Sequence, residues 1–247
     1  MTPPELYSNK IAFPVLQSLA SYQIQSDPLY PRAAQNRIGS LINLYQASAV
    51  NASYFPVLND TIEVLNTSSQ TLSAAGGSYK AAVAYPNTPL AVGLRLLAEA
   101  ITGGVGLDVA QVALGSFDTH ADQTPIQSQL FTTLAEAVFA FYQDLKAHNK
   151  DGDVVMMTWS EFGRRVQSNA SGGTDHGTAA PMFIIGTPVI GGFYGERPDL
   201  GNLNNGNLIF TTDFRAVYAT MLEKWLGVSA DGILGPNQFQ RLNFLPS

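Results

Sequence analysis

One pattern in the middle of the chain restricts the fold more than any other. Residues Asp108–Leu114 combine β-branched and apolar side chains and end at a glycine, which is typical of a strand. A long amphipathic helical pattern follows over Thr124–His148, and the apolar run Val154–Thr158 comes directly after it. Strand, helix and strand make a βαβ unit, whose two strands run parallel in one sheet. The sequence therefore predicts an α/β fold.

Composition excludes several classes of protein. With 247 residues, 45% of them hydrophobic, the chain is long enough to bury one sizeable core, with or without an attached lobe. Only 13% of the residues are charged and the net charge is -6, so no nucleic acid and no anionic membrane is expected as a partner. The apolar runs are too short for a transmembrane segment. Few charges beside many Ser, Thr, Asn and Gln favour a periplasmic or secreted protein, whose signal would lie outside this chain.

Glycine and proline mark an internal boundary. Two helical patterns, over 31–49 and 55–74, come before the interruptions at Gly76-Gly77 and at Pro86 and Pro89. The sequence predicts a helical and irregular N-terminal lobe over 1–89 and an α/β portion over 90–247. A helix rich in Leu and Ala is predicted over Pro89–Ile101, and a glycine-rich stretch after residue 186 predicts turns. A further helix is predicted between Thr211 and Gly227, with Thr211 or Thr212 as its N-cap and Gly227 at its C-cap.

Acidic residues and histidines gather in the loops after the two predicted strands. Asp118 and His120 follow the first strand, Glu161 follows the second, and Asp175 and His176 come after a Gly/Ser-rich loop. Loops that follow parallel strands emerge at the same edge of the sheet, so we expect these loops to be neighbours. Because the chain has no cysteine, a divalent ion would be held by imidazole and carboxylate ligands of this kind.

The spacing leaves three interpretations of this set open. The residues bind a metal, or each His and Asp caps its own loop through backbone hydrogen bonds, or they form an acid/base site without metal. His148, the third histidine, is interpreted as a solvated residue at a helix end. Arg164 is either an ion-pair partner or a planar donor to a phosphate or sulfate ester, and Arg165 is assigned a structural role.

The motifs FDTHADQ, DVVMMTWSEFGRRVQSNASGGTDHGTAAPMFIIG and TTDFRAVYATMLEKWLG resemble the C-terminal half of the domain of unknown function 1501 family, over roughly residues 90–230. That family is grouped with the alkaline-phosphatase and sulfatase superfamily, and many members are bacterial proteins with twin-arginine export signals. The resemblance implies a doubly wound α/β fold, with a mainly parallel sheet flanked by helices and divalent metal at its strand ends. It also implies that this chain is incomplete at its N-terminus.

The same resemblance suggests roles for individual residues. Asp118, His120 and His176 look like the ligand set of one superfamily metal, Zn²⁺ or similar. Glu161 and Asp175 would assist as further ligands or as partners of the ligands, and Arg164 would bind the anion. Phe162, which cannot bind a metal, stands where the superfamily has a histidine of its second site, and no residue matches the superfamily's nucleophile, so the catalytic residues are unknown.

Two hypotheses about function follow from this resemblance. The first is metal-dependent hydrolysis of a phosphate or sulfate ester, with a small anionic or sugar-linked ester as substrate. The second is a catalytically degenerate relative that serves as a binding or scaffold protein, in the envelope or secreted. Because no nucleophile is matched, the second is favoured for this chain, and nothing in the sequence indicates an oligomeric state.

Overall fold

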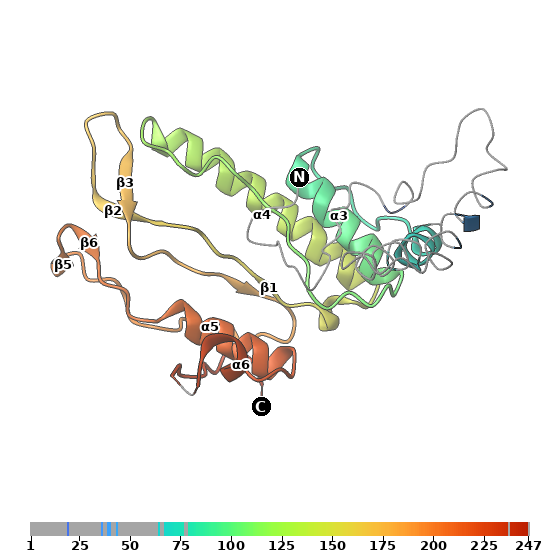
Figure 1. Cartoon of the computed structure of the whole chain (residues 1–247). Coiled ribbons are helices and arrows are strands. Elements are labelled where there is room, and N and C mark those ends of the chain that lie inside the picture. The colour runs from blue at the N-terminus through green and yellow to red at the C-terminus, as the bar shows by residue number, and fades with distance from the viewer. Residues whose placement is uncertain are drawn as a thin grey trace. The chain divides into compact units, whose positions relative to one another are not determined.

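The computed structural model describes residues 67–76, 79–236 and 238–246, together with isolated positions before residue 67 (Figure 1). The chain divides into two compact units, one of Met1–Ala81 with Val92–Ala110 and the other of Ala82–Ala91 with Gln111–Ser247. The helix predicted over 31–49 lies almost entirely outside the described residues, whereas residues 67–75 of the next one are helical. A lobe boundary at residue 89 stays a prediction.

Helix α3, Pro89–Thr102, forms where the sequence predicts it. Proline suits the first position of a helix, and the Thr88 hydroxyl accepts a hydrogen bond from the amide of Ala91 at 3.3 Å, as an N-cap does. The first unit has a small apolar core, which consists of Leu19, Leu72, Ala75 and Ala100, with Leu96 and Val105 packed against them.

The strand predicted at Asp108–Leu114 is not formed, and residues 105–119 have no regular secondary structure. Val109 is 71% exposed, so its β-branched side chain gains no packing from a neighbouring strand. Strand β1, Met156–Met157, lies within the predicted run Val154–Thr158. It pairs antiparallel with β4, Ile184–Ile185, and the predicted βαβ unit is therefore absent from the described part of the chain.

The other strands among the described residues form two antiparallel hairpins. Strand β2, Gly163–Ser168, pairs antiparallel with β3, Thr174–Gly177, and β5, Leu203–Asn204, pairs antiparallel with β6, Asn207–Leu208. Asn205 and Gly206 between β5 and β6 have φ values of 50° and 80°, as a tight type I′ turn requires. These short sheets do not test the doubly wound parallel fold, which stays a prediction.

The C-terminal segment folds onto the β1/β4 pair. Helix α5, Phe214–Thr220, starts at Asp213, whose carboxylate accepts from the Arg215 amide at 2.9 Å. This confirms the predicted helix and moves its N-cap from the expected threonines to the aspartate. The helical path continues through the π-helical turn η4, Met221–Trp225, and the short α6, Asp231–Leu234, follows. The core here contains Val217, Phe244 and Leu245, packed against Val155, Met157, Met182 and Ile184 among others.

Helix α4, Gln123–Ala147, confirms the long predicted helix, and the 3-10 turn η3, Asp151–Asp153, follows it. The buried face of α4 carries one charged residue, Asp144, whose side chain is 0% exposed. Its carboxylate accepts hydrogen bonds from the Ala82 amide and the Tyr85 hydroxyl, each at 2.8 Å. Asp144 thus attaches residues 82–85 to the helix. None of the described helices combines the length and the hydropathy that a membrane span requires.

Replacing Asp144 with alanine is expected to lower the free energy of unfolding by about 2–5 kcal/mol. The Ala82 amide and the Tyr85 hydroxyl would lose their buried acceptor, and the His148 ring, whose Nδ1 atom lies 3.3 Å from Asp144 Oδ1, would lose its acidic partner. Glu136→Ala on the exposed side of the same helix should change the free energy of unfolding by less than about 0.5 kcal/mol. Urea unfolding followed by circular dichroism measures both variants. Equal stabilities of the two variants would contradict the proposed attachment.

Candidate metal centre

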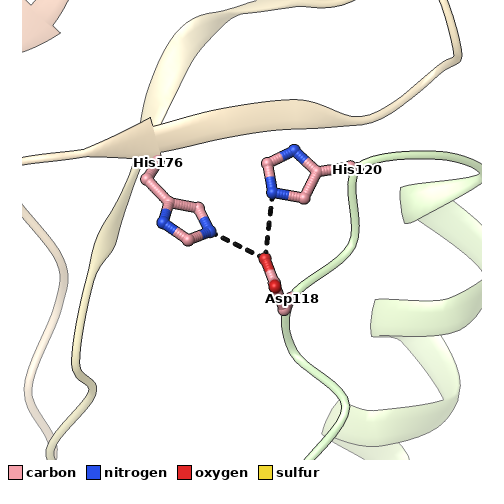
Figure 2. Close-up of side chains that lie close together, drawn as sticks. All are labelled: Asp118, His120 and His176. Atoms are coloured by element: carbon pink, nitrogen blue, oxygen red, sulfur yellow. Dashed lines mark hydrogen bonds and ion pairs between the residues drawn. The ribbon is translucent and has the colours of Figure 1, made fainter.

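Three side chains from two distant segments of the chain converge close to the residues that lead into α4. Asp118 and His120 lie in the irregular segment before the helix, and His176 lies on β3. The Asp118 Oδ1 atom is 2.7 Å from His176 Nε2 and 3.1 Å from His120 Nε2 (Figure 2). The structure therefore brings together the aspartate and the two histidines that the family resemblance implies as ligands of one metal.

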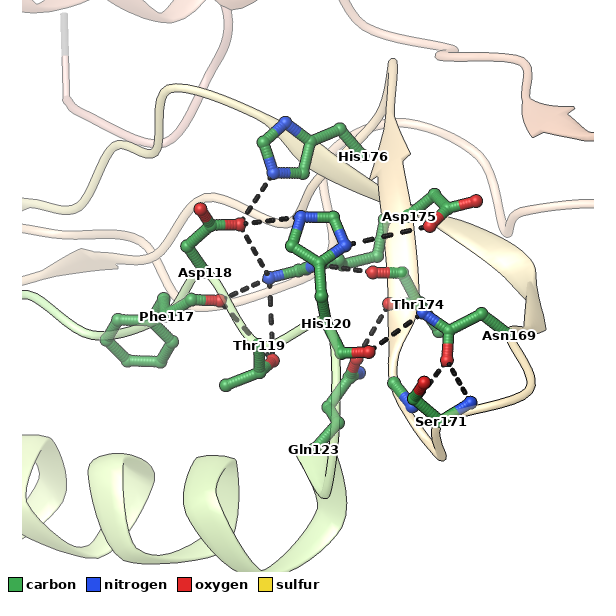
Figure 3. A network of polar contacts seen from close by, with 12 residues as sticks. Phe117, Asp118, Thr119, His120, Gln123, Asn169, Ser171, Thr174, Asp175 and His176 are labelled. Atoms are coloured by element: carbon green, nitrogen blue, oxygen red, sulfur yellow. Dashed lines mark hydrogen bonds and ion pairs between the residues drawn. The ribbon is translucent and has the colours of Figure 1, made fainter.

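The two segments meet through their backbones. Ala121 forms an isolated antiparallel bridge with Gly172, and the amide of Gln123 donates to the Gly172 carbonyl at 3.1 Å. The Asn169 side chain donates to the His120 carbonyl at 2.9 Å, and its own oxygen accepts from the Ser171 amide at 3.0 Å (Figure 3). The Gly/Ser-rich loop thus holds the segment that carries two of the three candidate ligands.

Gly173 permits this close approach. A Cβ atom at this position would lie 2.2 Å from the His120 carbonyl carbon and 2.4 Å from its oxygen, a separation that real Cβ atoms do not show. Any larger residue at 173 would therefore push His120 away from the hairpin. The close approach of the His120 backbone therefore requires a glycine at position 173, the second glycine of the GGTDHG motif.

Two aromatic contacts orient the histidine rings. The His176 ring stacks on Phe162 with centroids 3.7 Å apart and planes within 6°. The His120 and His176 rings also stack on each other, with their centroids 5.0 Å apart. Asp175, one residue before His176, places Oδ1 3.6 Å from His120 Nδ1, the ring nitrogen that does not face Asp118. Phe162 and Asp175 therefore contact the candidate ligands from the side.

The other residues assigned from the sequence lie around this cluster. Glu161 is exposed in the bend before β2 and is not among the three residues whose ligand atoms converge, so its role as a ligand stays a prediction. Arg164 on β2 has a side chain that is only 18% exposed, and it donates to the Phe117 and Thr174 carbonyl groups. An anion-binding role for Arg164 also stays a prediction.

Sequence reasoning missed two residues that shape the site. Asn169 bonds to the loop and to the His120 backbone, and the signal for it was the Asn-x-Ser-Gly-Gly sequence, which is typical of an Asx turn. Thr119 is 5% exposed and its hydroxyl accepts from the Gln127 side chain at 3.0 Å. Nothing local in the sequence distinguishes this threonine from the exposed ones.

The cluster's charges lower the pKa of Asp118. The largest cause is the hydrogen bond from His176, partial burial opposes it, and the positive charges of His120, His176 and Arg164 add to it. The pKa of this carboxyl group lies below its ordinary value of 3.8, so Asp118 is ionised throughout the neutral range. Asp118 therefore offers a negative charge beside two imidazole rings.

The direction of this pKa shift gives a pH dependence. The contribution of Asp118 to stability is fully present above its unfolded-state pKa and is lost as the pH falls through the lower native pKa. We expect the NMR titration of the Asp118 carboxyl carbon to have its midpoint below pH 3.8. His176→Gln should move that midpoint upward, because it removes the imidazole that donates the hydrogen bond to Asp118. A midpoint that His176→Gln leaves unchanged would contradict the assignment.

The donor set fits a divalent ion such as Zn²⁺. The three ligand atoms, one carboxylate oxygen and two imidazole nitrogens, all lie within 4.8 Å of one another. A tetrahedral zinc ion with bonds of about 2.0–2.1 Å separates its ligands by roughly 3.3 Å, so small side-chain movements suffice. Among the described residues this is the one such group of His, Asp or Glu. Three protein ligands leave a fourth position for water or substrate, as in catalytic zinc sites.

Comparison with known proteins adds one finding. The family model described as "Protein of unknown function (DUF1501)" matches residues 20–233. No curated protein and no solved structure matches the chain. The match covers the residues of the candidate metal centre and most of each compact unit.

Proposed function

The chain belongs to the DUF1501 family, and on that premise we propose that Asp118, His120 and His176 bind a divalent metal ion, Zn²⁺ or similar, for the hydrolysis of phosphate or sulfate esters. The observation that carries this proposal is the convergence of three ligand atoms of the right chemistry within 4.8 Å. The likeness of the FDTH and GGTDHG motifs to the alkaline-phosphatase and sulfatase superfamily supports an anionic ester as substrate.

Each residue has a defined task in this proposal. When bound, the ion supplies a Lewis acid that stabilises charge developing on the ester oxygens. His120 and His176 direct their Nε2 atoms to the same Asp118 oxygen, and Asp118, a carboxylate at neutral pH, supplies the negative charge of the site. The three side chains are 46–60% exposed, so an ester reaches them from solvent. Asp175 faces the Nδ1 atom of His120, as a carboxylate that orients a histidine ligand does.

Metal binding tests the centre directly. The wild-type chain is expected to bind Zn²⁺, and Asp118→Asn should weaken the affinity by at least about 10–100-fold because it removes the charged ligand. Asp153→Asn is a matched control, since the Asp153 side chain has the same 60% exposure but pairs with Lys150. Competition with a zinc-sensitive dye measures the dissociation constants. Absence of zinc binding by the wild type, or equal losses in both variants, would overturn the site.

Hydrolysis tests the reaction class. The zinc-loaded protein is expected to release nitrophenol from nitrophenyl phosphate or nitrophenyl sulfate, and a chelator should abolish the release because the Lewis acid is removed. The His120→Ala and His176→Ala double variant, incubated with the same zinc concentration, provides the background rate. Zinc-loaded protein that hydrolyses none of a panel of phosphate and sulfate esters would exclude the enzyme hypothesis.

A second candidate function is a catalytically degenerate binding or scaffold protein of the envelope or the secreted fraction. The Phe162 ring favours it, because this ring stacks on His176 at 3.7 Å and offers no ligand for a second ion. Under this hypothesis the His120→Ala and His176→Ala double variant loses stability while the binding of the scaffold's partner stays unchanged. Loss of zinc affinity without loss of stability would count against it.

A further inference from the structure

Arg164 differs from the residues around it in burial. Its side chain is 18% exposed, whereas those of Asp118, His120 and His176 are 46–60% exposed. A charged side chain that is withdrawn from solvent must find acceptors in the protein. Arg164 finds three, because its Nη1 atom donates to the Thr174 carbonyl, and its Nη2 atom donates to the Phe117 carbonyl and, at 3.4 Å, to the Thr119 hydroxyl.

These acceptors lie next to the candidate ligands. Phe117 and Thr119 are the two neighbours of Asp118 in the sequence, and Thr174 comes two residues before His176 on β3. One rigid guanidinium group therefore joins the segment that carries Asp118 to the strand that carries His176 (Figure 3 shows these acceptors around the cluster). The Arg164 Cζ atom also lies 5.0 Å from the centre of the Phe162 ring, which stacks on His176.

We infer that Arg164 is a positioning residue of the metal centre, which sets the distance between Asp118 and His176 and does not itself serve as the anion clamp. This inference rests on the proposed function, because the ligands it positions are those of the proposed metal site. The fixed fork of an arginine is required, since a lysine ammonium group offers donors from one point and does not span two separate carbonyl groups.

The sign of the effect on zinc affinity separates positioning from simple electrostatics. The Arg164 Nη2 atom is 3.8 Å from Asp118 Oδ1, so its positive charge repels a cation bound there. If charge alone mattered, the neutral variant Arg164→Gln would bind zinc more tightly. If Arg164 were an anion clamp, the same variant would bind zinc unchanged and inorganic phosphate more weakly. Positioning predicts weaker zinc binding.

The experiment compares Arg164→Gln and Arg164→Lys with Arg165→Gln. Arg165 is the adjacent arginine, and its Nη1 atom lies 3.6 Å from where a Cβ atom of Gly206 would be, over the β5/β6 turn. We expect both Arg164 variants to lose about 10–100-fold in zinc affinity, as outer partners of metal ligands do, and Arg165→Gln to lose little. Zinc binding that is unchanged or tighter in Arg164→Gln, or fully retained in Arg164→Lys, would overturn the inference.

A measurement without metal keeps this test separate from the proposed function. In the wild type, NMR should detect proton contacts between the Asp118 side chain and the His176 ring, because Asp118 Oδ1 lies 2.7 Å from His176 Nε2, and between the Phe162 and His176 rings, whose centroids are 3.7 Å apart. In Arg164→Gln the first contact should be lost because the segments separate, while the second stays because Phe162 and His176 lie together at the hairpin. Retention of both contacts would overturn the inference even if the wild type bound no zinc.

Discussion

The candidate site depends on one backbone crossing, where the segment before α4 runs against the loop between β2 and β3. The bridge between Ala121 and Gly172 and the bond from Asn169 to the His120 carbonyl fix this crossing. Gly173 leaves no room for a side chain there, because a Cβ atom would overlap the His120 backbone. Without the crossing, Asp118 and His120 would have no defined distance to His176, since the residues before them form no strand.

The sequence predicted the helices well because their signals are local. Helices α3, α4 and α5 appear where apolar periodicity, Pro89 and the C-terminal glycine place them. Strand pairing is non-local, and the β-branched composition of Asp108–Leu114 says nothing about a partner. A shared edge of a parallel sheet was expected to bring the loop of Asp118 and His120 beside the loop of Glu161, and the family resemblance added His176 to this set. The structure does bring Asp118, His120 and His176 together. Their convergence arises here from an antiparallel hairpin, so the prediction of proximity rested on a different geometry from the one observed.

The supporting residues were harder to predict than the ligands. The chain has only three histidines and no cysteine, so few residues can supply a nitrogen or sulfur ligand to a metal. This small number narrows the choice of candidate metal ligands. Thr119 and Phe162 act through burial and stacking, which depend on what packs beside them in the folded chain. Arg164 was open to two interpretations for the same reason. A guanidinium group serves an anion or a carbonyl equally well, and only its neighbours distinguish the two.

The candidate ligands Asp118, His120 and His176 are more exposed than the residues that support them, and this difference bears on the function of the site. Thr119 and Arg164 are largely withdrawn from water, whereas the three candidate ligand side chains are about half exposed. If these residues served only the stability of the loop, hydrogen bonds between exposed His and Asp side chains would contribute little, because water competes for them. A rigid, buried support beneath exposed polar ligands is better explained by a ligand that arrives from solvent. In the proposed function, the Asp118 carboxylate, whose pKa is lowered chiefly by the hydrogen bond from His176, supplies the negative charge that binds the cation.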